Sequence, residues 1–486
     1  MTLATRLGLI GVARVLVTAA LGLLALVLLL LIIGFLLNSF DARLSAEAVF
    51  ELTAPPNPFP PADNIYVALV GLNGPSHESV IDIGQARIAT YNQRLESLLR
   101  EPGAVPSDKR LDSGTLAFDG DLSAWQPLTT SIWTNVKSHR DDIAHLLANN
   151  QVLYSRYLEL HRLKGYYQAA QPSYLMPRAY VPTPLRTLFL ADVAIRLQVG
   201  SLEVQREALS DLAEDMRMWK LVLRGNGDIT AKMTATAALH GDFLLAADMI
   251  ADPNSKLDVV EEPLGAALRE LEPADWKIGN TFGTELRMRA THFMALRPFE
   301  IVPSVNGTAA SGNPQQPSWW WRTWNACLLH FFKANAATNL SAAQMARLAN
   351  LADSDPADFS QTLKAYRDWL DRNEGLVSPL VLYNPVGKFL VRTAGATWED
   401  YPQRAYDVAA FQRLVYLSLQ LRTQRIGTAD IAGFLTEHPE WSTHPIGNLP
   451  FRWSPETGEL AVVTVATQPR GRRFSVKVGQ PINRSN

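Results

Sequence analysis

The sequence predicts a mainly α-helical protein with a single N-terminal transmembrane helix, a body of antiparallel helical hairpins and a small C-terminal antiparallel β-hairpin region. Three observations carry this prediction: an uncharged apolar run near the N-terminus, helical spacing of apolar residues through most of the chain, and alternating spacing near its end. With 47% apolar residues, 19% charged residues and a net charge of −2, the composition is that of a globular body without a basic excess for nucleic acid.

The apolar run begins at Val15 and ends at Leu37, and its 23 residues would measure about 34 Å as a helix, enough to cross a bilayer core of about 30 Å. It is longer than the roughly 7–15 residues of a cleaved signal peptide and lacks a small-x-small site at its exit, so we expect an uncleaved signal anchor. Arg6 and Arg14 in the tail, residues 1–14, favour a cytoplasmic N-terminus and a body on the other side of the membrane.

Residues 38–63 form a juxtamembrane and proline-rich spacer. We expect the anchor helix to continue to about Leu52, because the five prolines between Thr53 and Pro61 then favour extended polyproline II backbone. The single cysteine, Cys327, excludes an intrachain disulfide, so the body must be stabilised by its core.

A helical body is expected over residues 64–301. Residues 184–250 predict three antiparallel helices, with Ser201 and Asp228 as caps of the second and third. The apolar face of the second helix carries Leu209, Leu212, Met216, Trp219 and Leu223. Further helical patterns cover residues 77–101, 130–163, 258–271, 276–296, 318–352, 357–373 and 402–425.

Residues 302–317 are small, polar and proline-bearing, which predicts a linker or long loop before a second helical region over residues 318–446. The chain then changes to alternating spacing in residues 447–486. Strands are expected at 449–453 and 459–465, joined by a turn with Pro455 and Gly458, and a third strand at 474–478.

The best candidates for chemistry are Glu285, Arg289 and His292, which share one helix face at i, i+4 and i+7. A Glu–His pair on one face suits acid–base catalysis, with the arginine binding an anion. The alternative is a structural i, i+4 ion pair. Nothing in the neighbouring sequence marks a nucleophile.

Other unusual positions have structural alternatives as well. Trp319, Trp320, Trp321 and Trp324 suit a membrane or partner contact, or the start of a core helix. The pairs His139/His145 and His438/His444 lack the spacing or the ligand number of a zinc site, and no phosphate-loop, Rossmann, zincin or nucleophile-elbow motif occurs. We therefore expect no cofactor and no metal.

Several stretches, in chain order, are distinctive: residues 64–72, 215–219 with 229–233, 331–339, and 384–388 with the 449–465 hairpin. Together they resemble an uncharacterised family of bacterial single-pass envelope proteins. The resemblance implies the anchor, a helical exported domain and the hairpin ending, and it implies no activity. The sequence thus favours a non-catalytic, membrane-anchored scaffold or interaction module with other envelope proteins as partners. An envelope hydrolase with a helical cleft, or a helical binder of an apolar ligand, remains the alternative.

Overall fold

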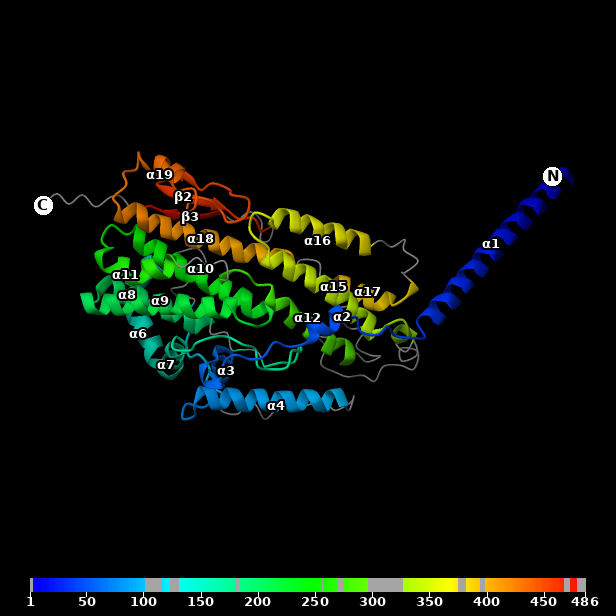
Figure 1. Cartoon of the computed structure of the whole chain (residues 1–486), viewed down its shortest axis with the longest axis horizontal. Helices are drawn as coiled ribbons and strands as arrows, with labels where there is room; N and C mark the ends of the chain where they lie inside the picture. The colour runs from blue at the N-terminus through cyan, green and yellow to red at the C-terminus, as the bar shows by residue number, and fades with distance from the viewer. Residues whose placement is uncertain are drawn as a thin grey trace. The chain divides into compact units, whose positions relative to one another are not determined.

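The computed structural model describes residues 3–100, 115–122, 131–177, 179, 183–255, 257–269, 275–295, 327–374, 382–393, 398–466 and 473–478. Within these ranges the chain is mainly helical and ends in a small antiparallel sheet, which confirms the predicted fold class (Figure 1). The expected linker at 302–317 and the tryptophans Trp319, Trp320, Trp321 and Trp324 lie outside the described residues.

Two compact units are formed by separate stretches of the sequence. The first unit comprises Met1–Phe50, Arg289–Gln344 and Trp369–Ala396, and the second comprises Glu51–Met288, Met345–Asp368 and Thr397–Asn486. The expected boundary at 302–317 stays a prediction. Three helices begin in one unit and end in the other. These helices are α12 (Asn280–Ala295), α15 (Ala334–Asp353) and α16 (Phe359–Glu374).

The first unit begins with α1 (Leu3–Leu37), whose segment Leu16–Leu37 is long and apolar enough to cross a membrane and is largely exposed. The helix does not continue to Leu52 as expected. It ends at Leu37, and a separate short helix, α2 (Ala46–Leu52), follows an extended stretch. The remaining described segments of this unit include α17 (Pro385–Thr393) and a core of Phe293, Phe332, Ala337 and Val391.

The centre of the second unit consists of α8 (Thr183–Val199), α9 (Leu202–Arg224) and α10 (Ile229–Ala251), which confirms the three helices predicted over residues 184–250. The caps are confirmed as well, since the side chain of Ser201 accepts a hydrogen bond from Val204 N and that of Asp228 from Ala231 N. Helix α9 packs against α8, α10 and α11 (Leu257–Arg269).

Helix α18 (Asp400–Thr423) is buried along almost its whole length. It contacts α10 and α11 on one side and the sheet on the other (Figure 1). The sheet has the order β1 (Arg452–Ser454), β2 (Glu459–Val463) and β3 (Arg473–Lys477), all antiparallel, which confirms the predicted strands. Leu460 pairs with Trp453 and Val476, and its side chain is buried.

Two helices of the second unit approach each other through glycines. The short helix α3 (Ile65–Gly71) is entirely buried and packs on α4 (Val80–Arg100). A Cβ atom at Gly71 would lie 1.8 Å from the carbonyl oxygen of Val80, and one at Gly84 would lie 2.0 Å from that of Val67. Only glycine therefore permits this contact between the two backbones.

The helical pattern predicted over residues 130–163 takes the form of several short pieces. They are α5 (Ile132–Asn135), the 3₁₀ turn η3 (Val136–Ser138), α6 (Arg140–Asn149) and α7 (Gln151–Leu160). The break between α6 and α7 lies at Asn150, whose side-chain amide donates to the carbonyls of Leu146 and Asp119. A side chain that bonds to nearby backbone in this way competes with the helix. The 3₁₀ turn η1 (Pro61–Asp63) and the short helix α19 (Ile431–Glu437) complete the described elements.

Candidate functional site

The end of α1 is attached to the rest of the first unit by a buried asparagine. The Asn38 side-chain nitrogen donates to the carbonyl of Gly34 at 2.7 Å and to that of Leu382 at 2.6 Å. Its side-chain oxygen accepts from the backbone nitrogen of Asn384 at 2.8 Å. The first bond gives the Gly34 carbonyl, in the last turn of α1, a side-chain donor, and the other two join the end of α1 to the segment that precedes α17.

A second asparagine continues this network. Asn384 has a φ of 52°, a left-handed conformation that asparagine adopts more readily than other side-chain-bearing residues. Its side-chain oxygen accepts from the backbone nitrogens of Lys333 at 2.8 Å and Gly387 at 3.1 Å, and its side-chain nitrogen donates to the Lys333 carbonyl at 3.2 Å. A Cβ at Gly387 would lie 2.4 Å from this amide, so the position requires glycine.

The segment after α1 also caps α15. The carboxylate of Asp41 accepts from the backbone nitrogens of Asn335 at 2.9 Å and Ala336 at 3.1 Å, in the first turn of that helix. A negative charge is favourable there because it faces unpaired N–H groups and the positive end of the helix dipole. One turn later, the Asn339 side chain donates to the Arg43 carbonyl and accepts from Ser45 N, each at 2.8 Å.

We call Asn38, Asp41, Asn339 and Asn384 the anchor joint. Sequence reasoning placed Asn339, Asn384 and Gly387 in distinctive stretches but assigned them no role. Their common position was not visible from the sequence, because the bonded residues are 294 to 346 positions apart. The joint gives α1 a fixed attachment within the first unit in place of the continuous helix expected from the sequence.

A cluster of buried charged residues joins four helices of the second unit. Asp215 on α9 accepts from the hydroxyl of Tyr157 on α7 at 2.6 Å and from Nε2 of His161, just after α7, at 3.0 Å. Arg186 on α8 donates to Asp215 at 3.4 Å and also to Asp242 on α10. The Trp219 indole nitrogen donates to the Tyr157 hydroxyl at 3.2 Å.

The pKa values of the two carboxyl groups in this cluster are shifted in opposite directions. Burial alone would raise the pKa of Asp215, but the hydrogen bond from His161 and the charge of Arg186 hold it below its ordinary value. Burial raises the pKa of Asp242 well above its ordinary value, and the neighbouring Asp215 charge adds to that effect. Arg186 is thus shared between two carboxyl groups, of which Asp215 stays ionised more readily than Asp242.

Asp215 lies in the distinctive stretch 215–219, but the sequence alone assigned no role to it or to its partners. A signal was present in the sequence, since Asp215 lies three residues after Leu212 and four before Trp219, on the apolar face of α9. A charged residue within an apolar stripe indicates a buried partner. With both carboxyl groups and Tyr157 fully buried, the geometry suits the joining of helices α7 to α10.

A buried lysine bonds to the carbonyl groups at the C-terminal end of α9. Lys232 on α10 is fully buried, and its ammonium group donates to the carbonyls of Leu223 at 2.7 Å and Gly225 at the end of α9. Burial lowers the pKa of Lys232 to about 7, although the charge of Asp228 opposes that effect. The cation thus satisfies carbonyls that the end of a helix leaves without a partner.

Two of the predicted catalytic residues form hydrogen bonds to other segments. The Glu285 carboxylate accepts from the backbone nitrogen of Ile229 at 2.8 Å, at the start of α10, and belongs to the second unit. Arg289 and His292 belong to the first unit. The Arg289 guanidinium donates to the Gln344 side chain at 3.2 Å and is buried, whereas His292 is partly exposed. The catalytic interpretation of these three residues stays a prediction.

His438 and His444, the second histidine pair considered in the sequence, have partners within the protein. Within the described residues, no group of three His, Cys, Asp or Glu side chains is arranged to hold a metal ion. His444 is fully buried, with Nε2 3.1 Å from Asp407 Oδ1 and with Nδ1 accepting from Ile446 N. His438 stacks on Trp441 and lies 3.3 Å from Glu440.

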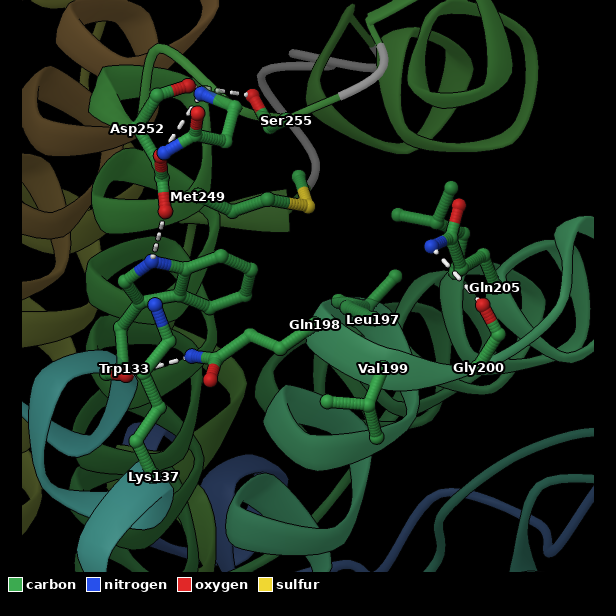
Figure 2. A pocket seen from close by; sticks show the side chains of 12 residues that line it. Trp133, Lys137, Leu197, Gln198, Val199, Gly200, Gln205, Met249, Asp252 and Ser255 are labelled. Carbon is green, nitrogen blue, oxygen red and sulfur yellow. Dashed lines mark hydrogen bonds between the residues drawn. The ribbon is translucent and has the colours of Figure 1, made fainter.

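A hollow of about 300 Å³ opens in the second unit, between the end of α8, the 3₁₀ turn after α5 and the end of α10 (Figure 2). The Trp133 indole donates to Asp252 Oδ2 at 3.0 Å, and the Gln198 amide donates to the Trp133 carbonyl at 2.6 Å. Leu209 and Met249 add apolar lining. The polar groups bond to one another, and none of the sequence-predicted site residues lines this hollow.

Comparison with known proteins adds no name to this arrangement. No protein-family model, no curated protein and no solved structure matches the chain. The anchor joint, the buried charged cluster and the apolar helix are therefore the features from which a function can be inferred.

Proposed function

We propose that the chain is a membrane-anchored, non-catalytic scaffold that holds its first unit in a defined orientation at a bilayer surface. In this proposal α1 spans the inner membrane of a bacterium with its N-terminus in the cytoplasm. The helical body then lies in the periplasm, where it contacts other envelope proteins. The exposed apolar segment Leu16–Leu37 supports the membrane assignment, and Arg6 and Arg14 support the orientation.

The observation that carries the proposal is the anchor joint. A tether that only prevents diffusion needs a flexible linker after the membrane helix. Here the residues that directly follow α1 are hydrogen-bonded to α15 and to the start of α17, and ordering each such residue costs about 1–2 kcal/mol of backbone entropy. A chain that fixes the angle between its anchor and its body is suited to presenting a surface in one orientation.

Double electron–electron resonance on the full chain in nanodiscs tests this rigidity. One spin label is attached to the exposed Cys327 and a second to Leu21→Cys, both within the first unit. We expect a narrow distance distribution for the wild-type pair and a broad one after Asn384→Gly. Asn149→Ala, at an exposed asparagine of the second unit, is the matched control and should keep the narrow distribution. A broad wild-type distribution would contradict the proposal.

Photo-crosslinking in cells tests the scaffold role itself. A scaffold that depends on orientation should give a reproducible set of crosslinked envelope proteins that is lost or altered in Asn384→Gly and retained in Asn149→Ala. A set that is identical in both variants would show that orientation is irrelevant to partner choice, and it would favour a simple tether.

A further inference from the structure

Large apolar side chains remain exposed in the first unit close to the end of α1. Phe40 is 79% exposed, Phe389 on α17 is 48% exposed, and Phe35 in the last turn of α1 is 55% exposed. Fully exposed phenylalanines are unfavourable in water, and a group of them marks a surface that contacts another phase or a partner.

The contacts along the last turn of α1 indicate the depth of this surface. A Cβ at Gly34 would lie 3.8 Å from the Phe331 ring and 3.9 Å from the Leu382 side chain, so both segments lie beside the last turn of the apolar helix. The His330 ring also stacks on Phe35, with centroids 3.9 Å apart, and Nε2 of His330 is 2.9 Å from the Phe35 carbonyl. If α1 spans the bilayer, its last turn lies at the boundary between hydrocarbon and headgroups.

Helix α17 begins next to the joint and has two distinct faces. Gly387 and Val391 are buried against the core, whereas Phe389 and Arg392 are exposed on the opposite side. Nine residues of helix measure only about 14 Å, so the whole of α17 stays near the end of α1. An apolar residue beside a basic one on the exposed face of a short helix is typical of helices that lie in a membrane interface.

The charges around the joint match an anionic surface. The segments 38–45, 327–335 and 382–393 carry the cations Arg43, Lys333, Lys388 and Arg392, and one carboxylate, Asp41, which caps α15. Basic residues next to a membrane helix are attracted by anionic lipid headgroups.

We propose that Phe40, Phe389, Arg43 and Arg392 form a headgroup face, with which the first unit rests in the interfacial layer of the bilayer and prefers anionic lipid. This inference rests on the proposed membrane anchoring. It adds that the folded body contacts the same bilayer that α1 crosses, which gives the rigid joint a physical purpose.

Collisional quenching of an environment-sensitive fluorophore tests the proposal in the full chain. In a Cys327→Ser background, single cysteines at Leu26, Phe40 or Phe389 are labelled with NBD, and each chain is reconstituted in phosphatidylcholine vesicles with or without an equal share of phosphatidylglycerol. Quenching by doxyl-labelled lipid reports contact with lipid, and quenching by iodide reports contact with water. A label inside protein responds to neither.

We expect the label at Leu26 to respond to doxyl lipid only, and the labels at Phe40 and Phe389 to respond to doxyl lipid more strongly when phosphatidylglycerol is present. A lipid-exposed Leu26 with Phe40 and Phe389 quenched by iodide alone would overturn the headgroup face and leave the anchor intact. A label at Leu26 quenched by iodide would instead overturn the proposed anchoring.

Charge removal separates lipid preference from apolar contact. Arg43→Gln in the Phe40-labelled chain should reduce the gain from phosphatidylglycerol by about fivefold, the effect of one cationic side chain beside an anionic surface. Lys137→Gln removes an exposed cation from the second unit and is the matched control. An equal loss in both variants would contradict a specific contribution of the headgroup face.

Discussion

The anchor joint and the buried charged cluster both hold helices together through polar side chains, but the chemistry of the two groups differs. In the joint, neutral asparagine amides bond to backbone groups, and the one carboxylate is exposed and caps a helix. In the cluster, charged side chains of α8 and α9 bond to each other away from water. Both connect segments that are far apart in the sequence.

The difference concerns what happens when one partner is lost. An amide that loses a backbone partner leaves one or two unsatisfied dipoles, each costing roughly 1–3 kcal/mol. A buried charge that loses its partner costs roughly 3–5 kcal/mol, because the desolvation of the remaining ion is no longer offset. Losing one partner should therefore cost less in the joint than in the cluster, and this contrast yields predictions of decreasing size.

The largest effect is expected at Asp215. Asp215→Asn removes the carboxylate that accepts from Tyr157, His161 and Arg186, and should lower the free energy of unfolding by about 3 kcal/mol. Asp242→Asn is the matched control, because burial raises the pKa of that carboxyl group and so weakens its charge, and it should cost less, about 1 kcal/mol. Urea unfolding of the detergent-solubilised chains, followed by circular dichroism, measures both. Equal costs, or a larger cost at Asp242, would contradict the opposite pKa shifts of the two carboxyl groups.

The sequence was sufficient for features with local causes. Helices α8, α9 and α10 follow from caps and apolar spacing that lie within each segment, and the strands β1 to β3 follow from alternation around a Pro–Gly turn. The break between α6 and α7 was missed because Asn150 bonds to the backbone of Asp119, which no local pattern reports.

The contacts of the joint could not be predicted either, because they also join residues that are far apart in the sequence. Asn38 and Asn384 are 346 positions apart, and neither carries a charge or an apolar side chain that a pattern search would weigh. Glu285 and Arg289 attracted attention because charged residues on one helix face suggest chemistry. Glu285 bonds to Ile229 and Arg289 to Gln344, and these contacts leave the catalytic role of both residues a prediction.

The next effect concerns the amide bridge of the joint. Asn384→Gly removes three side-chain hydrogen bonds while retaining the left-handed backbone, and should cost about 2 kcal/mol, localised to the first unit. Gly387→Ala should cost a similar amount, because its Cβ would displace the Asn384 side chain. In hydrogen exchange, both variants should lose protection at the amides of Lys333 and Gly387.

A double-mutant cycle tests whether these two residues act through one contact. With the Asn384 side chain already absent, Gly387→Ala has nothing to displace, so the combined variant should cost clearly less than the sum of the single changes. Additive costs would indicate that alanine at 387 disturbs α17 by another route.

A pH experiment tests the buried lysine of the second unit. The pKa of Lys232 is about 7 in the folded chain and 10.5 in the unfolded chain, so between these values the unfolded state binds more protons at this residue. Stability from this group is fully present above 10.5 and is lost as the pH falls through 7. The free energy of unfolding should therefore rise with pH by at most about 1.4 kcal/mol per unit.

Lys232→Met should flatten this rise, whatever it does to the stability itself. Lys364→Met, which removes an exposed lysine of the second unit, is the control for lost charge. An unchanged slope in Lys232→Met, measured by urea unfolding at several pH values, would place the titrating group elsewhere.

The smallest expected effect is at the exposed carboxylate of the joint. Asp41→Ala removes the cap of α15 and should cost about 1 kcal/mol, whereas Asp41→Asn retains an acceptor and should cost roughly half as much. Raising the salt concentration should bring Asp41→Asn closer to the wild type, because the lost term is a charge–dipole interaction in contact with solvent. Asp215→Asn should show no such approach, since that carboxylate is shielded from ions by its burial. A salt response of the same size at both positions would contradict the distinction between the exposed carboxylate of the joint and the buried carboxylate of the cluster.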